Sequence, residues 1–442
     1  MRLIAGEFDL RPFEKVALPQ SDKGKRIKQR DYLTSGKLPV VDQGQSDIGG
    51  YTNDEEMCFS GLLPVVIFGD HTRAVKLVNH PFVVGADGIK IFLPAADVLP
   101  KYLYYWMKSA PIENRGYGRH YQYLRKLNVP VPSMAKQQAI VDEIETQFSR
   151  LDEALANLQR VKANLKRYKA SVLKAAVEGR LVETEASIAQ REGRSYETGE
   201  QLLQRILEER RAKWTGRGKY KEPELPRIDH TFELPQGWAW ATLGHLSLSV
   251  KDGPHYSPKY VDDGIPFISG GNVRPEGIDF SSTKYISKEL HQELSKRCKP
   301  EIGDLLYTKG GTTGIARINT DPREFNVWVH VAVLKLTKSL HRFYVQHALN
   351  SQHCYRQAQE YTHGVGNQDL GLTRMVWITV PLPPLAEQAR IVAEVDRHLS
   401  IIREVEAEVD VNIQRSQALR QATLSKYFSS EKIAKRVPRY EK

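Results

Sequence analysis

Cysteine is scarce in this chain, and long apolar runs are missing. The 442 residues include three cysteines, Cys58, Cys298 and Cys354, which are far apart and form no Cys-x-x-Cys pair. This spacing supports neither a disulfide framework nor a cysteine-based zinc site, and it favours a reducing cytoplasm. The first residues lack the apolar core of a signal peptide, and the longest apolar run, residues 62–68, is short and broken by a proline. We therefore expect a soluble cytoplasmic protein that contacts no membrane.

Motifs that carry catalysis are also missing. The loop Gly310–Gly314 resembles a phosphate-binding loop, but no Gly-Lys-Ser/Thr ending follows it. The chain has no Asn-Pro-Pro-aromatic motif for a methyl donor and no His-Glu-x-x-His motif, and its histidines form no persuasive set of metal ligands. Nor is there a convincing acidic nuclease cluster. We therefore predict no catalytic, cofactor-binding or metal-binding residues in this chain.

Length and charge leave room for two domains and a polyanionic partner. Two hydrophobic cores and connecting helices fit comfortably into 442 residues. Lysine and arginine total 64 against 53 aspartates and glutamates, a formal net charge of +11. An excess of this size suits a nucleic acid, although many ordinary proteins are as basic.

The most informative feature is an internal repeat. Residues 129–156 align without gaps to residues 380–407, so that Val-Pro-Val-Pro-Ser-Met-Ala-Lys-Gln-Gln at 129–138 corresponds to Val-Pro-Leu-Pro-Pro-Leu-Ala-Glu-Gln-Ala at 380–389. Each copy predicts a proline-rich strand that leads into a long helix. The chain therefore alternates globule, helix, globule, helix, as expected for a tandem duplication with pseudo-two-fold symmetry.

Both repeated helices carry a narrow apolar stripe. In the first copy, apolar residues recur every three or four positions from Ile140 to Val172, and the second copy keeps the stripe from Ile391 to Leu424 with weaker residues. Such a seam has to be covered, and the other copy is the nearest cover. We predict an antiparallel intramolecular coiled coil. Glu406, Asn412 and Ser416 either fix its register or face solvent.

Each globule is predicted to have strands first, among them 38–41 in the first and 265–268 in the second, and a helix late, which indicates an α+β fold. The stretch between the first helix and the second globule is charged, with a Thr198-x-x-Gln201 capping box that opens a helix. We interpret it as a connector whose charged face is either solvated or a dock for a partner subunit or the DNA backbone. The predicted parts are a first globule at 1–132, a first long helix at 133–180, a charged connector with a short helix at 181–230, a second globule at 231–383, a second long helix at 384–430 and a basic C-terminal tail at 431–442.

These residues resemble the specificity subunits of type I restriction-modification systems. The resemblance rests on the Pro-x-Pro-x-x-x-x-Gln doublet at 130–137 and 381–388, on Leu-Pro-Gln-Gly-Trp at 234–238, on Gly-Ile-Pro-Phe at 264–267 and on Gly-Asp-Leu-Leu at 303–306. It covers nearly the whole chain. The first copy departs from the pattern, because Lys136 replaces a glutamate and no Leu-Pro-x-Gly-Trp opens the first globule.

The resemblance implies that each globule is a target recognition domain that reads one half of a bipartite, asymmetric DNA site. It implies that the helices space the two halves and dock two methyltransferase subunits. The chain itself would be non-catalytic and would hold no cofactor. Restriction and translocase subunits would complete the complex, and the partner subunits would use S-adenosylmethionine, ATP and Mg²⁺.

Candidate DNA-contacting residues lie on three segments of the first globule. The run at 23–30 is rich in cations suited to phosphates, although it could equally be a solvated loop. The segment Gly69–Arg73 is predicted to form the end of a hairpin. The loop at 115–125 combines cations with groups that can read base edges, and the alternative interpretation is a turn at a strand edge. The candidates are Lys25, Arg26, Lys28, Arg30, His71, Arg73, Arg115, Arg119, His120, Tyr121, Gln122 and Arg125.

The second globule offers equivalent segments, each of which could also be an ordinary polar turn. They lie at 251–259, 272–274, 309–313 and 363–368. Their candidates are Lys251, His255, Tyr256, Lys259, Asn272, Arg274, Lys309, His363, Asn367 and Gln368.

Two other functions are compatible with parts of the sequence. A globule could hide a nuclease or methyltransferase site, in which case the purified chain alone would cut or methylate DNA. The chain could instead be a scaffold that joins proteins, in which case it would show no salt-dependent binding to duplex DNA.

Overall fold

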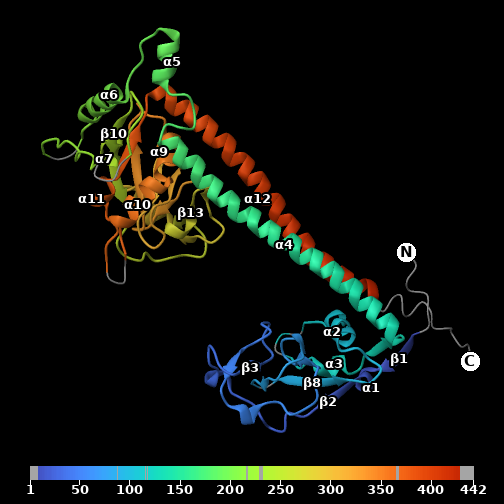
Figure 1. The fold of residues 1–442 in the computed structure, drawn as a ribbon. Coiled ribbons are helices and arrows are strands. Elements are labelled where there is room, and N and C mark those ends of the chain that lie inside the picture. The colour runs from blue at the N-terminus through green and yellow to red at the C-terminus, as the bar shows by residue number, and fades with distance from the viewer. Residues whose placement is uncertain are drawn as a thin grey trace, which may run out of the picture. The chain divides into compact units, whose positions relative to one another are not determined.

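The computed structural model describes residues 8–86, 88–114, 116, 118–215, 218–227, 232–364 and 368–428. It comprises two compact units. The first unit consists of residues 1–160 and 409–442, and the second unit consists of residues 161–408. Each unit contains one globule, here called the first head and the second head, together with a part of each long helix (Figure 1).

The first head is built from three small sheets and one main helix. A four-stranded antiparallel sheet has the order β2-β8-β5-β6, a three-stranded sheet has the order β4-β3-β7, and β1 pairs with β9. Its elements are β1 (Asp9–Pro12), α1 (Phe13–Val16), β2 (Ala17–Gln20), η1 (Gln29–Asp31), β3 (Leu38–Val41), β4 (Gly50–Thr52), η2 (Glu55–Met57), β5 (Val65–Gly69), β6 (Val75–Val78), β7 (Val83–Val84), β8 (Ile89–Pro94), α2 (Pro100–Ser109), α3 (Tyr121–Leu124) and β9 (Asn128–Val131).

The central strand β5 is buried on both faces, and its side chains alternate between two cores. Val66 and Phe68 pack in the cluster that contains Leu103 and Trp106 of α2. Val65 and Ile67 pack in the second cluster, which contains residues of β3 and β7. Because side chains alternate along a strand, one apolar run supplies both layers.

The second head repeats this topology and adds elements. Its four-stranded sheet has the order β11-β19-β16-β17, its three-stranded sheet has the order β15-β12-β18, and β10 pairs with β20. The added β13–β14 hairpin lies between β12 and β15. The elements are β10 (Ala239–Thr242), α7 (Leu243–Leu246), β11 (Ser247–Asp252), β12 (Ile265–Ile268), η3 (Gly270–Asn272), β13 (Val273–Arg274), β14 (Gly277–Ile278), β15 (Lys284–Ile286), α8 (Lys288–Ser295), β16 (Leu305–Thr308), β17 (Ala316–Ile318), β18 (Asn326–Val327), β19 (Val331–Leu336), α9 (Arg342–Leu349), α10 (Gln352–Glu360), α11 (Leu372–Met375) and β20 (Thr379–Leu382).

The predicted long helices are present and equal in length. Helix α4 (Met134–Val177) and helix α12 (Leu385–Phe428) each have 44 residues and begin at equivalent positions of the repeat. In the first unit, Leu424 of α12 joins the cluster of Val141 and Ile144 of α4. In the second unit, the hydroxyl of Tyr168 lies 2.9 Å from Nδ1 of His398. In both units, later residues of one helix face earlier residues of the other, which confirms the antiparallel coiled coil.

Of the polar seam residues, Ser416 is buried, whereas Glu406 and Asn412 are half-buried. The Ser416 hydroxyl donates to the backbone carbonyl of Asn412 one turn earlier, at 2.9 Å. Its polarity is therefore satisfied within its own helix, so this hydrogen bond does not set the register of the pair.

The repeated glutamine joins each head to its long helix. Gln137 is fully buried, its Oε1 accepts from the Leu99 amide at 2.8 Å, and its Nε2 donates to the Pro132 carbonyl at 2.9 Å. Gln388 makes the same two hydrogen bonds, with the His341 amide at 2.9 Å and the Pro383 carbonyl at 2.9 Å. The glutamine side chain thus supplies hydrogen-bond partners for the backbone amide where α2 or α9 begins and for a carbonyl just after the proline-rich strand.

The charged connector is more ordered than the sequence suggested. It contains two helices, α5 (Glu185–Glu192) and α6 (Gly199–Ala212), instead of one, and the predicted Thr198–Gln201 capping box is present. Leu202 and Ile206 of α6 are fully buried in the core of the second unit, so this helix packs on the second head through its apolar face. Its apolar residues at four-residue spacing cover the second head, and Glu209 of the same helix accepts from the amides of Lys338 at 3.0 Å and Ser339 at 3.3 Å.

The two departures of the first copy from the family pattern have one structural explanation. Glu387 is buried, and its carboxylate accepts from the indole N–H of Trp238 at 3.1 Å and from the amide of Glu185 at 2.8 Å. The first head has no equivalent tryptophan to bind such a carboxylate. Lys136 stands at the equivalent position and is only half-buried there.

Candidate nucleic-acid interface

The basic segment of the first head forms a turn after β2. Lys23 and Gly24 adopt positive φ angles of 53° and 77°. The Ile27 amide then donates to the Val84 carbonyl at 3.0 Å, which holds the segment against the three-stranded sheet. This turn leaves most of the nearby cations at the surface.

The cations of this segment differ in their surroundings. The ammonium of Lys25 donates to the carbonyl of Glu56 at 2.6 Å, and Arg26 forms an ion pair with Asp22. Lys28 and Arg30 are exposed, and Arg30 lies 3.6 Å from the carboxylate of Asp31. Lys28 and Arg30 are the better placed of the four for phosphate contacts.

The turn at 69–73 and the loop at 115–125 are brought together by Asp70. The Asp70 carboxylate accepts from the Tyr121 amide at 2.8 Å, and its carbonyl accepts from the His120 amide at 2.8 Å. Nδ1 of His120 lies 2.9 Å from the same carbonyl. Two segments that the sequence presented as separate candidates therefore form one loop pair.

This arrangement divides the candidates of the loop pair. His120 is fully buried, so its prediction as a DNA-contacting residue is wrong and its role is structural. Tyr121 is half-buried against Phe92, with ring centroids 5.6 Å apart. The exposed side chains of the pair are Arg119, Gln122 and Arg125.

His71 and Arg73 are half-buried at the hairpin end. Arg73 has a positive φ of 59°, and its guanidinium donates to the Ile112 carbonyl at 2.8 Å. This bond fixes the guanidinium to the end of the segment that follows α2. Arg115 lies outside the described residues, so its prediction has no structural outcome.

In the second head, Lys309 is buried and ties equivalent segments together. Its ammonium lies 2.6 Å from the Asp369 carboxylate and 3.7 Å from that of Asp252. The amide of Leu370 donates to the Lys309 carbonyl at 2.8 Å. The prediction of Lys309 as a DNA contact is wrong, because a buried ammonium held by two carboxylates is unavailable to a phosphate.

Asp252 anchors the segment 251–259. Its buried carboxylate accepts from Arg297 at 2.8 Å and lies 3.3 Å from Nε2 of His255. A hollow of about 360 Å³ next to it is lined by His255, Tyr256 and Arg297, among others. The exposed candidates of this segment are Lys251, His255, Tyr256 and Lys259.

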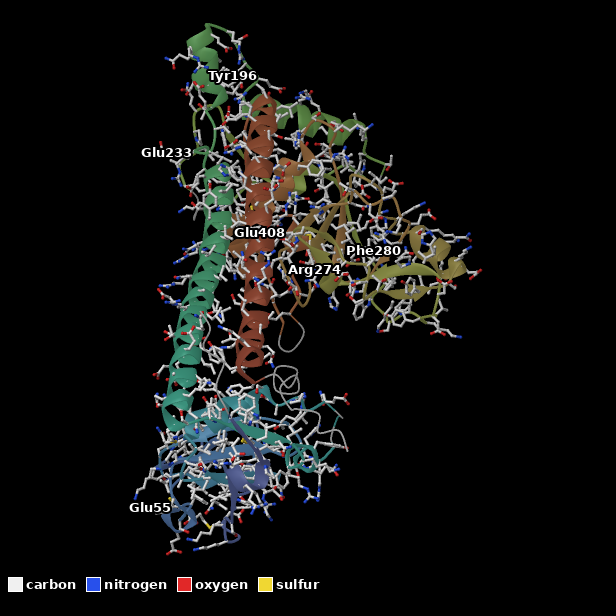
Figure 2. The ribbon with its side chains drawn as sticks, turned by 90° about the vertical axis from the view of Figure 1, so that its right-hand side faces the viewer. Glu55, Tyr196, Glu233, Arg274, Phe280 and Glu408 are labelled. Atoms are coloured by element: carbon white, nitrogen blue, oxygen red, sulfur yellow. The ribbon has the colours of Figure 1, made fainter. Side chains whose placement is uncertain are left out.

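The remaining candidates of the second head lie on the hairpin and on the loop before α11. Asn272 is buried, and its Oδ1 accepts from the amide of Ser269, the N-cap of η3, at 2.8 Å, so its prediction as a DNA contact is wrong. Arg274 is exposed, 3.3 Å from Asp279, and Figure 2 shows it on the hairpin near Phe280. His363 and Gln368 are exposed, and Asn367 lies outside the described residues.

Both heads therefore bond the same turn to the same loop, but through side chains of different charge. A turn after the central strand is bonded to the loop that precedes a short helix, through Asp70 in the first head and through Lys309 with Asp369 in the second. The buried member carries opposite charge in the two heads. The surrounding exposed side chains also differ, so the two surfaces present different hydrogen-bonding groups.

Two charged residues escaped the sequence prediction. Lys76 of β6 is buried with its ammonium 3.6 Å from Asp42 and without a hydrogen-bond partner, and burial lowers its pKa. The burial of Lys76 could have been predicted from the sequence, because this lysine lies within the apolar run 74–78. Arg297 lies 45 residues after Asp252 in the sequence, so its contact with that carboxylate follows from the fold and not from any local motif.

Nothing in the described part of the chain provides a metal site, because no three histidine, cysteine, aspartate or glutamate side chains come together there. Burial raises the pKa of the Cys298 thiol to about 11 and that of Cys354 to about 12. Neither thiol has the lowered pKa of a reactive nucleophile. Among the described residues, none of the helices is long and apolar enough to span a membrane.

Comparisons with known proteins give a consistent result. Residues 236–411 match the family model described as type I restriction modification DNA specificity domain. The chain is 25% identical over 312 residues to the type I restriction enzyme EcoBI specificity subunit of Escherichia coli, covering 69% of this chain and 58% of that subunit. It is 21% identical over 447 residues to the EcoDI specificity subunit of Escherichia coli, covering 91% of each.

A shorter match is closer in sequence. The EcoR124I/EcoR124II specificity subunit of Escherichia coli is 32% identical over 127 residues, which is 27% of this chain and 31% of that subunit. The fold resembles a chain in a structure concerned with complex assembly and conformational transition of the type I restriction-modification system, with a TM-score of 0.63 and 15% identity, over 97% of this chain and 99% of that one.

Proposed function

We infer that the chain belongs to the type I restriction-modification specificity family, and we propose that it is a non-catalytic subunit that directs such a complex to its DNA sequence. Each head reads one half of a bipartite, asymmetric site. The long helices set the spacing between the halves and dock methyltransferase subunits.

The observation that carries this proposal is the repeated architecture with divergent loops. Two heads with the same strand order each lead into a 44-residue helix, and the glutamine contacts at the junctions are the same. The exposed loop residues differ, with Arg119, Gln122 and Arg125 in one head and His363 and Gln368 in the other. Similar heads with different reading groups suit two unlike half-sites.

The partners of the complex supply the chemistry. We propose two methyltransferase subunits that use S-adenosylmethionine, together with restriction and translocase subunits that use ATP and Mg²⁺. The base to be methylated has to leave the duplex stack, and the specificity subunit presents that base to its partner.

A salt titration tests the DNA-binding step. The full-length chain, with its methyltransferase subunits, is titrated with a fluorescent duplex of random sequence at several salt concentrations. Affinity is expected to fall linearly with the logarithm of salt concentration. The double variant Arg119→Gln/Arg125→Gln is expected to lower the slope by about two, because the loop loses two cations that displace counterions from DNA on binding.

Arginines on α4 provide the matched control for this titration. Arg150 and Arg160 are exposed and lie outside the heads, so Arg150→Gln/Arg160→Gln removes the same charge without touching the loop pair. Its slope is expected to equal that of the wild type. Binding that does not depend on salt, or equal losses in both variants, would contradict the assignment of the loop.

A further inference from the structure

A groove beside the coiled coil is filled in the second unit by the chain's own hairpin. The turn between β13 and β14 places Pro275 and Glu276 against the long helices. The Glu276 carboxylate lies 2.8 Å from the Lys169 ammonium of α4, and the Pro275 carbonyl accepts from Arg317 at 3.1 Å. Only about 70 Å³ of space is left between α9, α4 and α12 at this place.

The equivalent groove in the first unit is open. It lies between α2, α4 and α12 and has a volume of about 760 Å³. Its walls include Tyr104 and Lys108 from α2, Phe148 and Ser149 from α4, and Arg420 from α12.

The two grooves occupy the same place in the repeat. In the first, the Tyr105 hydroxyl of α2 lies 3.4 Å from the Glu145 carboxylate of α4. In the second, Nε2 of His347 in α9 lies 3.1 Å from the Asp396 carboxylate of α12. Arg420 of the open groove stands at the helix position that Lys169 holds in the filled one.

The difference arises from the length of one loop. In the second head, residues 269–283 connect β12 to β15 and form the hairpin. In the first head, residues 42–49 connect the equivalent strands β3 and β4, and no hairpin forms there. The first unit thus has the groove without the segment that fills it.

The open groove has two cationic groups in its walls, Arg420 and Lys108. The Arg420 guanidinium lies over the Phe148 ring at 4.6 Å and donates through Nη2 to Asp152 at 2.7 Å. Its Nε is buried and has no hydrogen-bond partner. The Lys108 ammonium lies over the Tyr104 ring at 4.6 Å. A carboxylate entering the groove would meet both cations above an aromatic floor.

We propose that this groove receives an acidic turn of a partner protein, as the Pro275–Glu276 turn occupies its counterpart. The occupant is a protein segment, because the counterpart groove is filled by a protein turn whose carboxylate pairs with Lys169, and Arg420 stands at the equivalent helix position. The identity of the partner rests on the proposed function: it is the methyltransferase subunit that docks on the first unit.

Filling the groove tests the proposal. Ser149 is an exposed wall residue of α4, so Ser149→Trp blocks the groove with little effect on folding. The matched control is Ala154→Trp, an exposed position on the same helix outside the groove walls. Native mass spectrometry of the full-length chain titrated with its methyltransferase subunit is expected to show at least tenfold weaker binding of one subunit to Ser149→Trp and wild-type binding to Ala154→Trp.

A peptide separates this proposal from the proposed function. A cyclic peptide with the sequence of residues 271–280 carries the acidic turn and is expected to bind the wild-type chain. Binding is expected to be lost with Ser149→Trp and with a peptide in which the Glu276 equivalent is glutamine. Peptide binding without any methyltransferase binding would contradict the proposed function alone. Unchanged binding of both probes to Ser149→Trp would overturn the groove proposal, whereas a loss confined to that variant supports it.

Discussion

At the scale of single residues, the repeated glutamine shows what the Pro-x-Pro-x-x-x-x-Gln repeat does physically. Gln137 and Gln388 each hydrogen-bond two backbone groups, an amide where a helix begins and a carbonyl just after a strand ends. Neither group has a partner within regular secondary structure. An unpaired buried polar group costs more than a hydrogen bond contributes, because it loses water and gains no partner. The motif therefore maintains the junction between head and helix and does not contact DNA.

Gln137→Ala is expected to lower the free energy of unfolding by about 2 kcal/mol, because it leaves the Leu99 amide and the Pro132 carbonyl unpaired. Urea denaturation followed by circular dichroism measures the change. The neighbouring Gln138→Ala removes an exposed side chain and should stay within about 0.5 kcal/mol of the wild type. Equal effects of the two variants would argue against the junction role.

His245 is expected to make the stability of the second unit depend on pH. Burial lowers its pKa to about 4, and its Nδ1 accepts from the Thr242 amide at 2.9 Å, which requires a neutral ring. Because the folded pKa lies below the unfolded value of about 6.5, the contribution is complete above pH 6.5 and is lost as pH falls towards 4. The loss is at most about 3 kcal/mol.

The comparison that isolates this contribution is wild type against His245→Gln in urea denaturation from pH 7.5 to 4. The variant keeps an acceptor near the Thr242 amide but has no proton to take up. Its unfolding free energy should fall less steeply between pH 6.5 and 4. Parallel profiles for the two proteins would show that the ring titrates normally.

At the scale of elements, apolar patterns predicted more than polar ones. The predicted strands at 38–41 and 265–268 match β3 and β12, because short apolar runs bounded by turn residues are too short for a helix. The β13–β14 hairpin was missed, since its strands have two residues each and no apolar run. The burial of three polar residues was also unpredictable. His120 and Lys309 are each paired with a residue far away in the sequence, and Asn272 bonds within a turn.

The hairpin contact gives a prediction at this scale. Burial alone would raise the pKa of Glu276, but the hydrogen bond and charge of Lys169 outweigh burial and lower it. The ion pair therefore stabilises the second unit above the unfolded glutamate pKa, about 4.3, and this contribution is lost as pH falls below that value. Because the carboxylate is half exposed, the contribution is below about 1 kcal/mol.

Glu276→Gln should abolish this acid-dependent component while keeping the shape of the turn. The measurement is the difference in unfolding free energy between wild type and variant at pH 7 and at pH 3. The expected difference is larger at pH 7. A difference that is the same at both pH values would mean that the ion pair contributes nothing.

At the scale of the whole molecule, the long helices give the proposed spacing role its physical basis. Both helices continue from one unit into the other without a break between residues 134 and 177 or between 385 and 428. Removing residues 157–163 and 408–414 together takes one heptad from each copy and keeps the apolar stripe on the same face. The pair becomes shorter by about 10 Å, close to three base pairs.

This double deletion is expected to change the spacer of the recognised site or to abolish its recognition, while each head keeps its half-site preference. Binding selections from a duplex library with variable spacers measure both properties. Recognition of the original site at unchanged affinity would show that the helices do not set the spacing.

The central claim is that this chain determines where its partners modify DNA. Genome-wide mapping of N6-methyladenine tests it most directly, in cells that carry the chain with its methyltransferase and in cells that lack only the chain. We predict a split, asymmetric methylated motif that disappears when the chain is removed. Persistence of the same motif without the chain would contradict the account.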